Sequence, residues 1–214
     1  MIQSKATYAY ETIKEKILSG RLPAPSTISE DALQEELKIS RTPIREALRT
    51  LEHEGFVEIY PRKGISVAPV SLDLLRDVYD VRLAIEPLIT RRTCGKIPDA
   101  TLRQFRERFL NPPTLAEDRR SLGHYYNGVD ADFHRALYHY AQNRFLSDSL
   151  SLVADHERRI RNMAFNPATN HVVTAEHVAI IDALLERDEE KSFSMAQIHV
   201  ECARKNAFRN LLDL

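Results

Sequence analysis

Residues 40–49 read Ser-Arg-Thr-Pro-Ile-Arg-Glu-Ala-Leu-Arg and carry the strongest helix signal in the first part of the chain. On a helix, which turns about 100° per residue, the apolar side chains of this stretch share one face and its arginines form a stripe beside them. We expect this helix to be capped by Ser40 or Thr42 and to run to Glu54, where Gly55 stops it. The inward residues are Ile44, Ala47, Leu48 and Leu51, and the stripe consists of Arg41, Arg45 and Arg49.

Two shorter helices and a β-hairpin are predicted around this helix. Apolar spacing indicates helices over residues 5–19 and 29–38, the second with Ser29 as its expected N-cap. Alternating side chains indicate strands over 56–60 and 65–68. Three helices followed by a hairpin are typical of a winged helix-turn-helix. The hairpin tip carries Arg62, Lys63 and Gly64.

The basic stripe and the hairpin tip together predict a surface that binds double-stranded DNA. The first turns of a recognition helix reach base edges, where arginine can bond guanine through two hydrogen bonds. Threonine and backbone amides hold phosphates. The alternative is a solvated basic face on a small helical domain, but the hairpin that directly follows the helix favours DNA. The predicted contact residues are Arg41, Thr42, Arg45, Arg49, Arg62, Lys63 and Gly64.

Residues 11–68 resemble the DNA-binding domain of GntR-type bacterial transcription regulators. The resemblance rests on residues 40–48 and on residues 51–57, which read Leu-Glu-His-Glu-Gly-Phe-Val. Some members of that family carry an arginine that contacts DNA early in the second helix. Asp31 stands near that position here, so an extra phosphate contact is expected to be missing, and the family pattern does not fix the operator preference of this chain.

Composition limits the cellular setting but does not point to DNA. The chain has 214 residues and a net charge of −1, and residues 1–70 contain ten basic and ten acidic side chains. The DNA prediction therefore depends on where the charges lie. Two cysteines, Cys94 and Cys202, exclude a disulfide framework and favour a reducing cytoplasm. No apolar run approaches the ~20 residues of a membrane span, so no membrane partner is expected.

After a brief linker at residues 69–71, apolar spacing predicts helices only. We therefore expect a mostly α protein, with a winged helix-turn-helix domain over residues 1–70 and an all-helical bundle over residues 71–214. Pro87 lies within the first helix of the bundle and predicts a kink. The expected helices cover residues 72–93, 99–109, 115–141, 144–164, 171–187 and 189–211.

A histidine–aspartate cluster is predicted inside the bundle. Asp130 and His134 are four residues apart and share an apolar helix face, where they need a partner or a metal. His177 and His199 each lie eleven residues from Asp188, the expected N-cap between the last two helices. Positions equidistant from the turn of an antiparallel helical hairpin lie at the same height, so these two histidines should meet.

Three imidazoles and one carboxylate suit a divalent metal. Zn²⁺ is the first expectation, and Ni²⁺, Mn²⁺ and Fe²⁺ are alternatives. The predicted ligands are Asp130, His134, His177 and His199. The alternative is that each histidine is satisfied separately in the core. Cys202, one turn from His199, could be a ligand, although a core cysteine is the more common case.

Residues 72–208 resemble the helical ligand-binding domain of the FadR subgroup, called the FCD domain. The matching pieces are Asp-x-x-Phe-His at residues 130–134, Glu-His-x-x-Ile at 176–180 and Met-x-x-x-His at 195–199. Many FCD domains bind a metal through one aspartate and three histidines at these places. The resemblance implies a homodimer whose metal helps to hold a small carboxylate effector.

Arginines within the bundle give weaker signals. Arg82 lies on an apolar helix face and needs an anion, which could be an effector carboxylate or Glu86 four residues later. Arg158, Arg159 and Arg161 form a basic cluster for which a solvated face is the first expectation, and the alternative is that one of them faces the pocket.

Three functions are consistent with these sequence features. The leading one is a ligand-responsive, DNA-binding transcription regulator that acts as a homodimer on a near-palindromic operator. The second is a metal-dependent enzyme that uses the histidine–aspartate site, although a nearby general base is missing from the sequence pattern and the first 70 residues would have no role. The third is a regulator with a purely structural metal and no effector.

Overall fold

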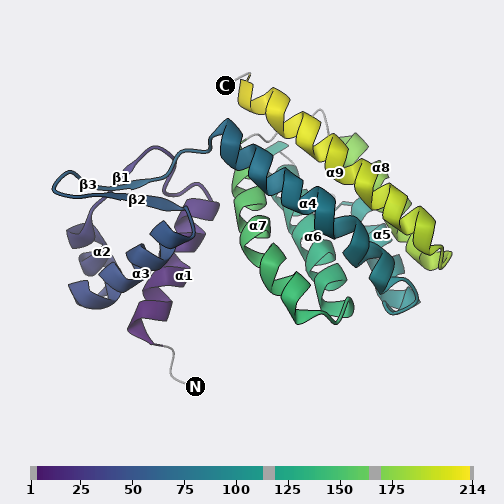
Figure 1. Cartoon of the computed structure of the whole chain (residues 1–214), viewed down its shortest axis with the longest axis horizontal. Coiled ribbons are helices and arrows are strands. Elements are labelled where there is room, and N and C mark those ends of the chain that lie inside the picture. Colours follow the sequence, from purple (N-terminus) through teal and green to yellow (C-terminus); the bar gives the residue numbers. More distant parts are fainter. Residues whose placement is uncertain (1–3, 113–118, 164–169, 213–214) are drawn as a thin grey trace. The chain divides into compact units, whose positions relative to one another are not determined.

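The computed structural model describes residues 4–112, 119–163 and 170–212. Contacts divide the chain into two compact units, Met1–Ser71 and Leu72–Leu214. The first combines helices with a small sheet, and the second is built from helices over its described residues (Figure 1). The protein is therefore mostly helical, as the sequence predicted.

The first unit contains three helices whose ends match the sequence signals. The hydroxyl of Ser29 caps the second helix by accepting a hydrogen bond from the Ala32 amide at 3.2 Å. Ser40 is the N-cap of the third helix but makes no such side-chain bond. Gly55, just beyond that helix, has φ +78°, a conformation that favours glycine. The helices are α1 (Lys5–Leu18), α2 (Glu30–Leu37) and α3 (Arg41–His53).

A three-stranded antiparallel sheet completes this unit. The predicted hairpin is confirmed as β2 (Val57–Tyr60) and β3 (Gly64–Val67), with Ile59 opposite Ile65. The sequence did not predict β1 (Thr27–Ile28), which pairs with the other side of β3. Two residues are too few to show the alternation that identifies a strand.

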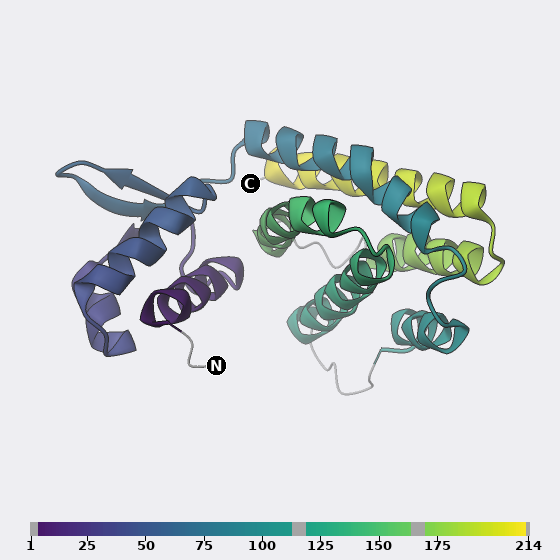
Figure 2. The same cartoon turned by 60° about the horizontal axis from the view of Figure 1, so that its bottom comes forward.

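One face of α3 is buried and the other is exposed. Ile44, Leu48 and Leu51 are fully buried in a core that α1 shares through Ala9 and Ile13. This burial fixes the rotation of α3 about its axis. The arginine stripe on the opposite side is therefore left in solvent, and the hairpin begins shortly after the helix ends (Figure 2).

The second unit consists of longer helices whose bounds lie close to the predicted ones. Pro87 lies inside the first of them, which continues past it. The expected starts and ends near residues 115 and 164 lie outside the described residues. The helices are α4 (Leu72–Thr93), α5 (Asp99–Leu110), α6 (Arg119–Tyr140), α7 (Arg144–Met163), α8 (Asn170–Leu185) and α9 (Glu189–Leu212).

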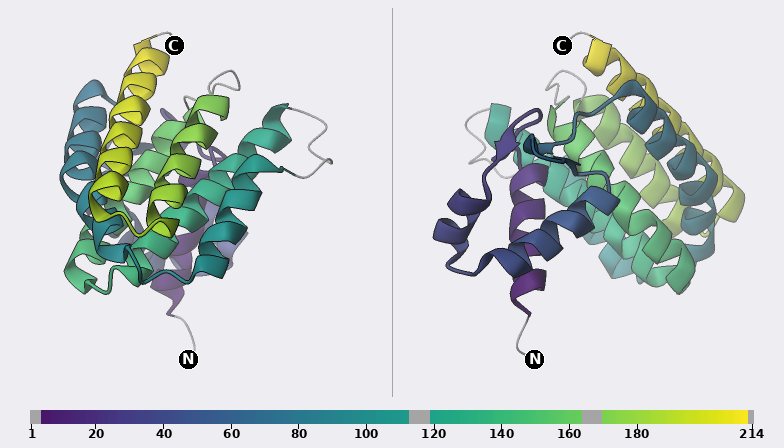
Figure 3. Two further views of the ribbon diagram at one scale, coloured as in Figure 1. Left: turned by 90° about the vertical axis from the view of Figure 1, so that its right-hand side faces the viewer. Right: turned by 60° about the vertical axis from the view of Figure 1, so that its left-hand side comes forward.

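Helix pairing in this unit brings distant parts of the sequence together. Helices α8 and α9 form a hairpin, and α4 runs along α9 (Figure 3). Phe109, Phe133 and Leu137 belong to the buried core beneath them. No helix among the described residues is long and apolar enough to span a membrane.

Candidate metal centre and DNA-binding surface

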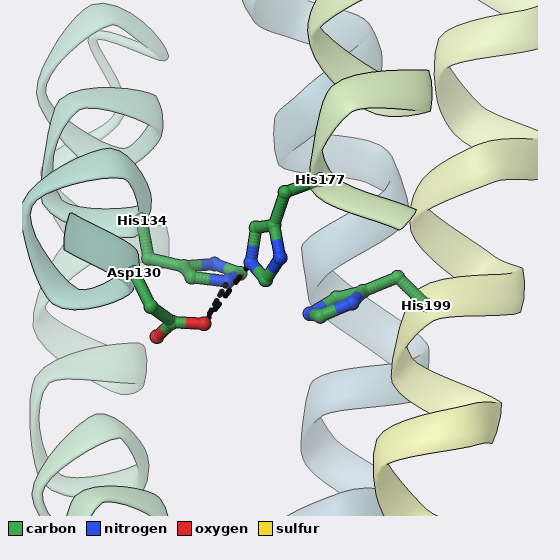
Figure 4. Close-up of side chains that lie close together, drawn as sticks. All are labelled: Asp130, His134, His177 and His199. Carbon is green, nitrogen blue, oxygen red and sulfur yellow. Dashed lines mark ion pairs between the residues drawn. The ribbon is translucent and has the colours of Figure 1, made fainter. Parts of the chain in front are cut away.

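Four polar side chains from three helices converge in the interior of the second unit. Helix α6 supplies Asp130 and His134, α8 supplies His177, and α9 supplies His199 (Figure 4). All four are buried, and one potential ligand atom from each lies within 4.8 Å of the others. The structure thus brings together the residues that the sequence singled out for a metal.

The α8–α9 turn explains why two of the histidines meet. The Asp188 carboxylate accepts a hydrogen bond from the Lys191 amide at 2.9 Å, so it caps α9 as expected. The ring centroids of His177 and His199 are 4.3 Å apart. Phe109 stacks on His177 with centroids 4.5 Å apart, which restricts that ring from the side of α5.

The two oxygens of Asp130 have different partners. Oδ1 lies 3.0 Å from His177 Nε2 and 3.9 Å from His134 Nε2. Oδ2 contacts the Arg161 guanidinium. Burial opposes ionisation of Asp130, but Arg161 and His134 outweigh it and hold the pKa of this carboxyl well below its usual range. Asp130 is therefore a carboxylate whose Oδ1 faces the histidines.

Glu176 orients the third histidine. Its Oε2 lies 3.0 Å from His199 Nδ1, which leaves Nε2 of that ring for another ligand. A carboxylate behind an imidazole is the common arrangement around metal-bound histidine. The Cys202 thiol forms a hydrogen bond with the Glu176 carboxyl group. Cys202 is not part of the four-residue group.

His134 shows most directly that the site suits a metal. Its side chain is buried, and neither ring nitrogen has a hydrogen-bond partner among the described residues. The nearest acidic group on the Nδ1 side, Glu86 Oε2, is 3.9 Å away. A buried imidazole without partners is costly unless another group completes it.

Burial also keeps the histidines in the form that binds metals. It lowers the pKa of His134, against the opposing effect of Glu86. It lowers the pKa of His199 well below the usual range, and His177 and His134 add to this shift. Both rings are therefore neutral at pH 7, which is the protonation state of a metal ligand.

The donor set and its spacing fit a divalent metal. Nitrogen and carboxylate ligands bind Zn²⁺ at about 2.0–2.2 Å, so ligand atoms around one ion lie roughly 3–4 Å apart. The observed limit of 4.8 Å needs only a small contraction. Three imidazoles and one carboxylate are also acceptable to Ni²⁺, Mn²⁺ and Fe²⁺.

Arg82 lies near this centre but is bound to acidic side chains. Its Nε and Nη2 donate to Glu86 at 2.7 and 3.1 Å, and its Nη1 lies 3.3 Å from Glu157. The pair with Glu86 is the alternative that the sequence left open. Tyr138 also donates to Glu86, at 3.3 Å, so this carboxylate joins α4 to α6.

The expectation of a solvated face is wrong for two arginines of the 158–161 cluster. Arg159 is buried, and Arg161 contacts both Asp130 and Glu157. Consecutive charged residues on α7 hide which side chains point inward. Only the packing of α7 against its neighbours shows that the face of Arg161 is directed to the metal ligands.

These ion pairs form a network with an excess of negative charge. The carboxylates of Glu86, Asp130 and Glu157 face the guanidiniums of Arg82 and Arg161. Within these pairs three carboxylates face only two guanidiniums, an arrangement that favours a bound cation. The Arg82–Glu86 pair within α4 was one of the two alternatives open from the sequence. The contacts of Glu157 and Arg161 with other helices could not be predicted, because ion pairs between helices leave no periodic signal.

The predicted DNA contacts lie on exposed parts of the first unit. Arg41, Thr42, Arg45 and Arg49 are exposed on α3, opposite its buried face. The tip residues Arg62, Lys63 and Gly64 are also exposed. The Lys63 amide donates to the Tyr60 carbonyl at 3.0 Å, which closes the turn.

Two family descriptions match the chain and together account for most of it. Residues 5–67 match "Bacterial regulatory proteins, gntR family", and residues 77–201 match the FCD domain. The chain belongs to the GntR family of regulators. Its second unit is an FCD domain, a type of domain that commonly binds metals. The resemblance stated from the sequence is thereby confirmed.

Relatives that match this GntR-family protein over most of both chains are named as HTH-type transcriptional regulators. BphR of Paraburkholderia xenovorans, described as an uncharacterized HTH-type transcriptional regulator, is 28% identical over 94% of this chain and 84% of its own. The HTH-type transcriptional repressor RspR of Escherichia coli is 26% identical over 84% of this chain and 78% of its own. The protein is accordingly a DNA-binding transcription regulator and not an enzyme.

Solved structures share the fold of this regulator. E. coli McbR/YncC superposes with a TM-score of 0.78 at 18% identity, covering 98% of this chain and all (100%) of the other. A putative GntR regulator from Rhodococcus sp. RHA1 also reaches 0.78, at 19% identity and with 96% and 98% of the two chains covered. These likenesses establish the architecture.

The buried ion pairs predict a large effect for Arg82→Met. This change leaves Glu86 and Glu157 without their shared cation and should destabilise the FCD domain by about 3–5 kcal/mol. Amide hydrogen exchange of peptides from residues 72–110 measures this loss in the full chain. Arg91→Met, at a partly exposed position of the same helix, should change the same quantity by less than about 1 kcal/mol. Equal effects of the two changes would contradict the importance assigned to the buried network.

Proposed function

We propose that this regulator is switched by a small ligand. In this proposal the FCD domain binds one divalent metal, Zn²⁺ in the first instance, through Asp130, His134, His177 and His199. A small carboxylate, such as a hydroxy acid or a sugar acid, then binds at the metal and changes the affinity of the protein for its operator. The observation that carries the proposal is the convergence of four buried ligand groups in a chain that also has a DNA-binding domain.

The DNA side of the proposal rests on the exposed face of α3. The arginines of its first turns would bond guanine edges in the major groove, and Thr42 would contact phosphate. The hairpin tip at residues 62–64 would reach the adjacent backbone or groove. Because one such module contacts few base pairs, we propose a cytoplasmic homodimer that reads a near-palindromic site.

The effector side of the proposal rests on charge. A divalent cation reverses the net negative charge of the buried network, so an added carboxylate would be electrostatically favoured. Arg82 is the proposed second anchor for the effector. Because its guanidinium already binds Glu86 and Glu157, the effector would have to replace one of these carboxylates.

The connection between the two sites would pass through helix packing. The metal ligands come from α6, α8 and α9, and α4 packs along α9. Helix α4 also begins directly after the DNA-binding unit, at Leu72. An effector can change DNA affinity only by binding two arrangements unequally, and such coupling typically amounts to about 1–3 kcal/mol.

The first prediction from this proposal concerns base recognition. Arg45→Ala should lower the preference for the operator over scrambled DNA by roughly 1–3 kcal/mol, because a guanine contact is lost. Competition gel shifts at fixed salt measure this preference, and elemental analysis should show an unchanged metal content. Equal preference in the variant and the parent would assign Arg45 to the solvent-exposed surface.

The second prediction concerns assembly. Sedimentation should give a particle of twice the mass of one chain, both free and bound to a single operator duplex. Two recognition helices entering successive major grooves require half-sites about 10 base pairs apart, centre to centre, or a multiple of that spacing. A monomer in both states would contradict this part of the proposal.

The third prediction concerns the metal and the effector. His177→Ala combined with His199→Ala should abolish stoichiometric metal binding and the response to effector, because half of the ligand set is removed. Elemental analysis gives the metal content, and DNA titrations with and without lactate or gluconate give the response. His139→Ala, an exposed position on α6, should change neither.

Two outcomes would overturn this assignment. A double variant that keeps a full metal load and a normal response would show that the site is misplaced. If the parent protein binds the metal but binds no member of a wider panel of hydroxy acids and sugar acids, the metal has a purely structural role. Circular dichroism and retained DNA binding establish that the double variant is folded.

A further inference from the structure

The first two arginines of the recognition helix are held by side chains of α2. Arg45 donates from Nε and Nη2 to the two oxygens of Glu30, each at 2.9 Å. Arg41 donates from Nε to Gln34 at 2.8 Å and from Nη2 to Asp31 at 2.5 Å. These three residues of α2, Glu30, Asp31 and Gln34, form the α2 buttress.

Both arginines use the same edge of the guanidinium group. A guanidinium has five N–H donors, and the bonds to the α2 buttress occupy the edge formed by Nε and Nη2. The outer edge, formed by Nη1 and the second proton of Nη2, is the one that can bond O6 and N7 of guanine. Among the described residues, no bond reaches Nη1 of Arg41 or Arg45, and their side chains are 54% and 58% exposed.

We propose that the α2 buttress sets the sequence specificity of this regulator. Glu30 and Asp31 act as positioning residues: they hold Arg45 and Arg41 by their inner edges and present the outer edges to guanine. This inference rests on the proposed role of α3 in base recognition. It adds that recognition depends on acidic residues of a helix that itself need not touch the bases.

Two physical effects give the α2 buttress this role. An arginine that is ordered before binding loses less conformational entropy when it bonds a base. A carboxylate beside it also repels phosphate, so the held arginines contribute less to binding of unrelated DNA. The hydrogen bond from Arg45 lowers the pKa of Glu30, which keeps this side chain ionised at neutral pH.

Arg49 provides an internal comparison. It continues the same stripe one turn further along α3, yet it makes no bond to α2 in the described part of the chain. We therefore assign Arg49 to phosphate contacts, whose strength depends on salt and not on sequence. The stripe that looks uniform in the sequence then has two functional parts.

The experiment compares specific and non-specific DNA binding in matched variants. An operator is first selected from random duplexes with the parent protein. Dissociation constants for this operator and for a scrambled duplex are then measured at one salt concentration for Glu30→Gln, Asp31→Asn and the double variant. The specificity ratio, which is the dissociation constant for the scrambled duplex divided by that for the operator, should fall by roughly five- to tenfold for each single change.

Glu35→Gln is the matched control, because it removes the same charge from an exposed position of α2. In the described part of the chain, the hydrogen bonds and ion pairs of Arg41 and Arg45 do not include Glu35. It should strengthen binding to both duplexes by a similar factor and leave their ratio unchanged. Glu30→Gln should also lose its effect on the ratio when Arg45 is already alanine, since it acts through that side chain.

Three results would overturn the inference. If Glu30→Gln and Asp31→Asn behave like Glu35→Gln, the α2 carboxylates act only through their charge. If their effect persists in the Arg45→Ala background, they act through another group. If Arg45→Ala itself leaves the ratio unchanged, the proposed role of α3 fails as well, whereas an effect of Arg45→Ala without an effect of Glu30→Gln removes this inference alone.

Discussion

The FCD domain depends on one constraint: a buried carboxylate must be satisfied on both of its oxygens. Asp130 is 6% exposed, and its oxygens face Arg161 on one side and His177 on the other. Arg161 in turn binds Glu157, which also faces Arg82. A continuous line of charge therefore runs from α6 through α7 to α4, and the helices must keep the rotations that allow it.

The same principle, an arginine held by acidic side chains, recurs on the surface of the first unit with a different consequence. Arg82 is buried, so its bonds to Glu86 satisfy charges that have no access to water. Arg45 is exposed, so its bonds to Glu30 chiefly fix the orientation of a side chain that remains available to DNA. Burial decides whether such a pair is a structural necessity or a means of positioning a functional group.

Local sequence signals predicted most of the elements and part of the metal site. The apolar face of α3, the Ser29 cap and the strands around residues 61–63 were all recognisable, because each depends on neighbours close in the chain. The meeting of His177 and His199 was also predictable, since both are equally far from the α8–α9 turn. Strand β1 was not, because a two-residue strand has no pattern of its own.

Periodicity and local motifs were enough to predict a winged helix-turn-helix followed by a helical FCD domain, with three histidines and an aspartate as candidate ligands. The charged residues that surround these ligands became apparent only from the packing of the helices. Glu86, Arg161 and Glu176 lie on different helices, and their contacts depend on how those helices rotate and pack. The same holds for the arginine stripe of α3, whose first two members are distinguished from the third by a neighbouring helix. Periodicity along one helix reports which face is buried, but it contains no information about the partner across the interface.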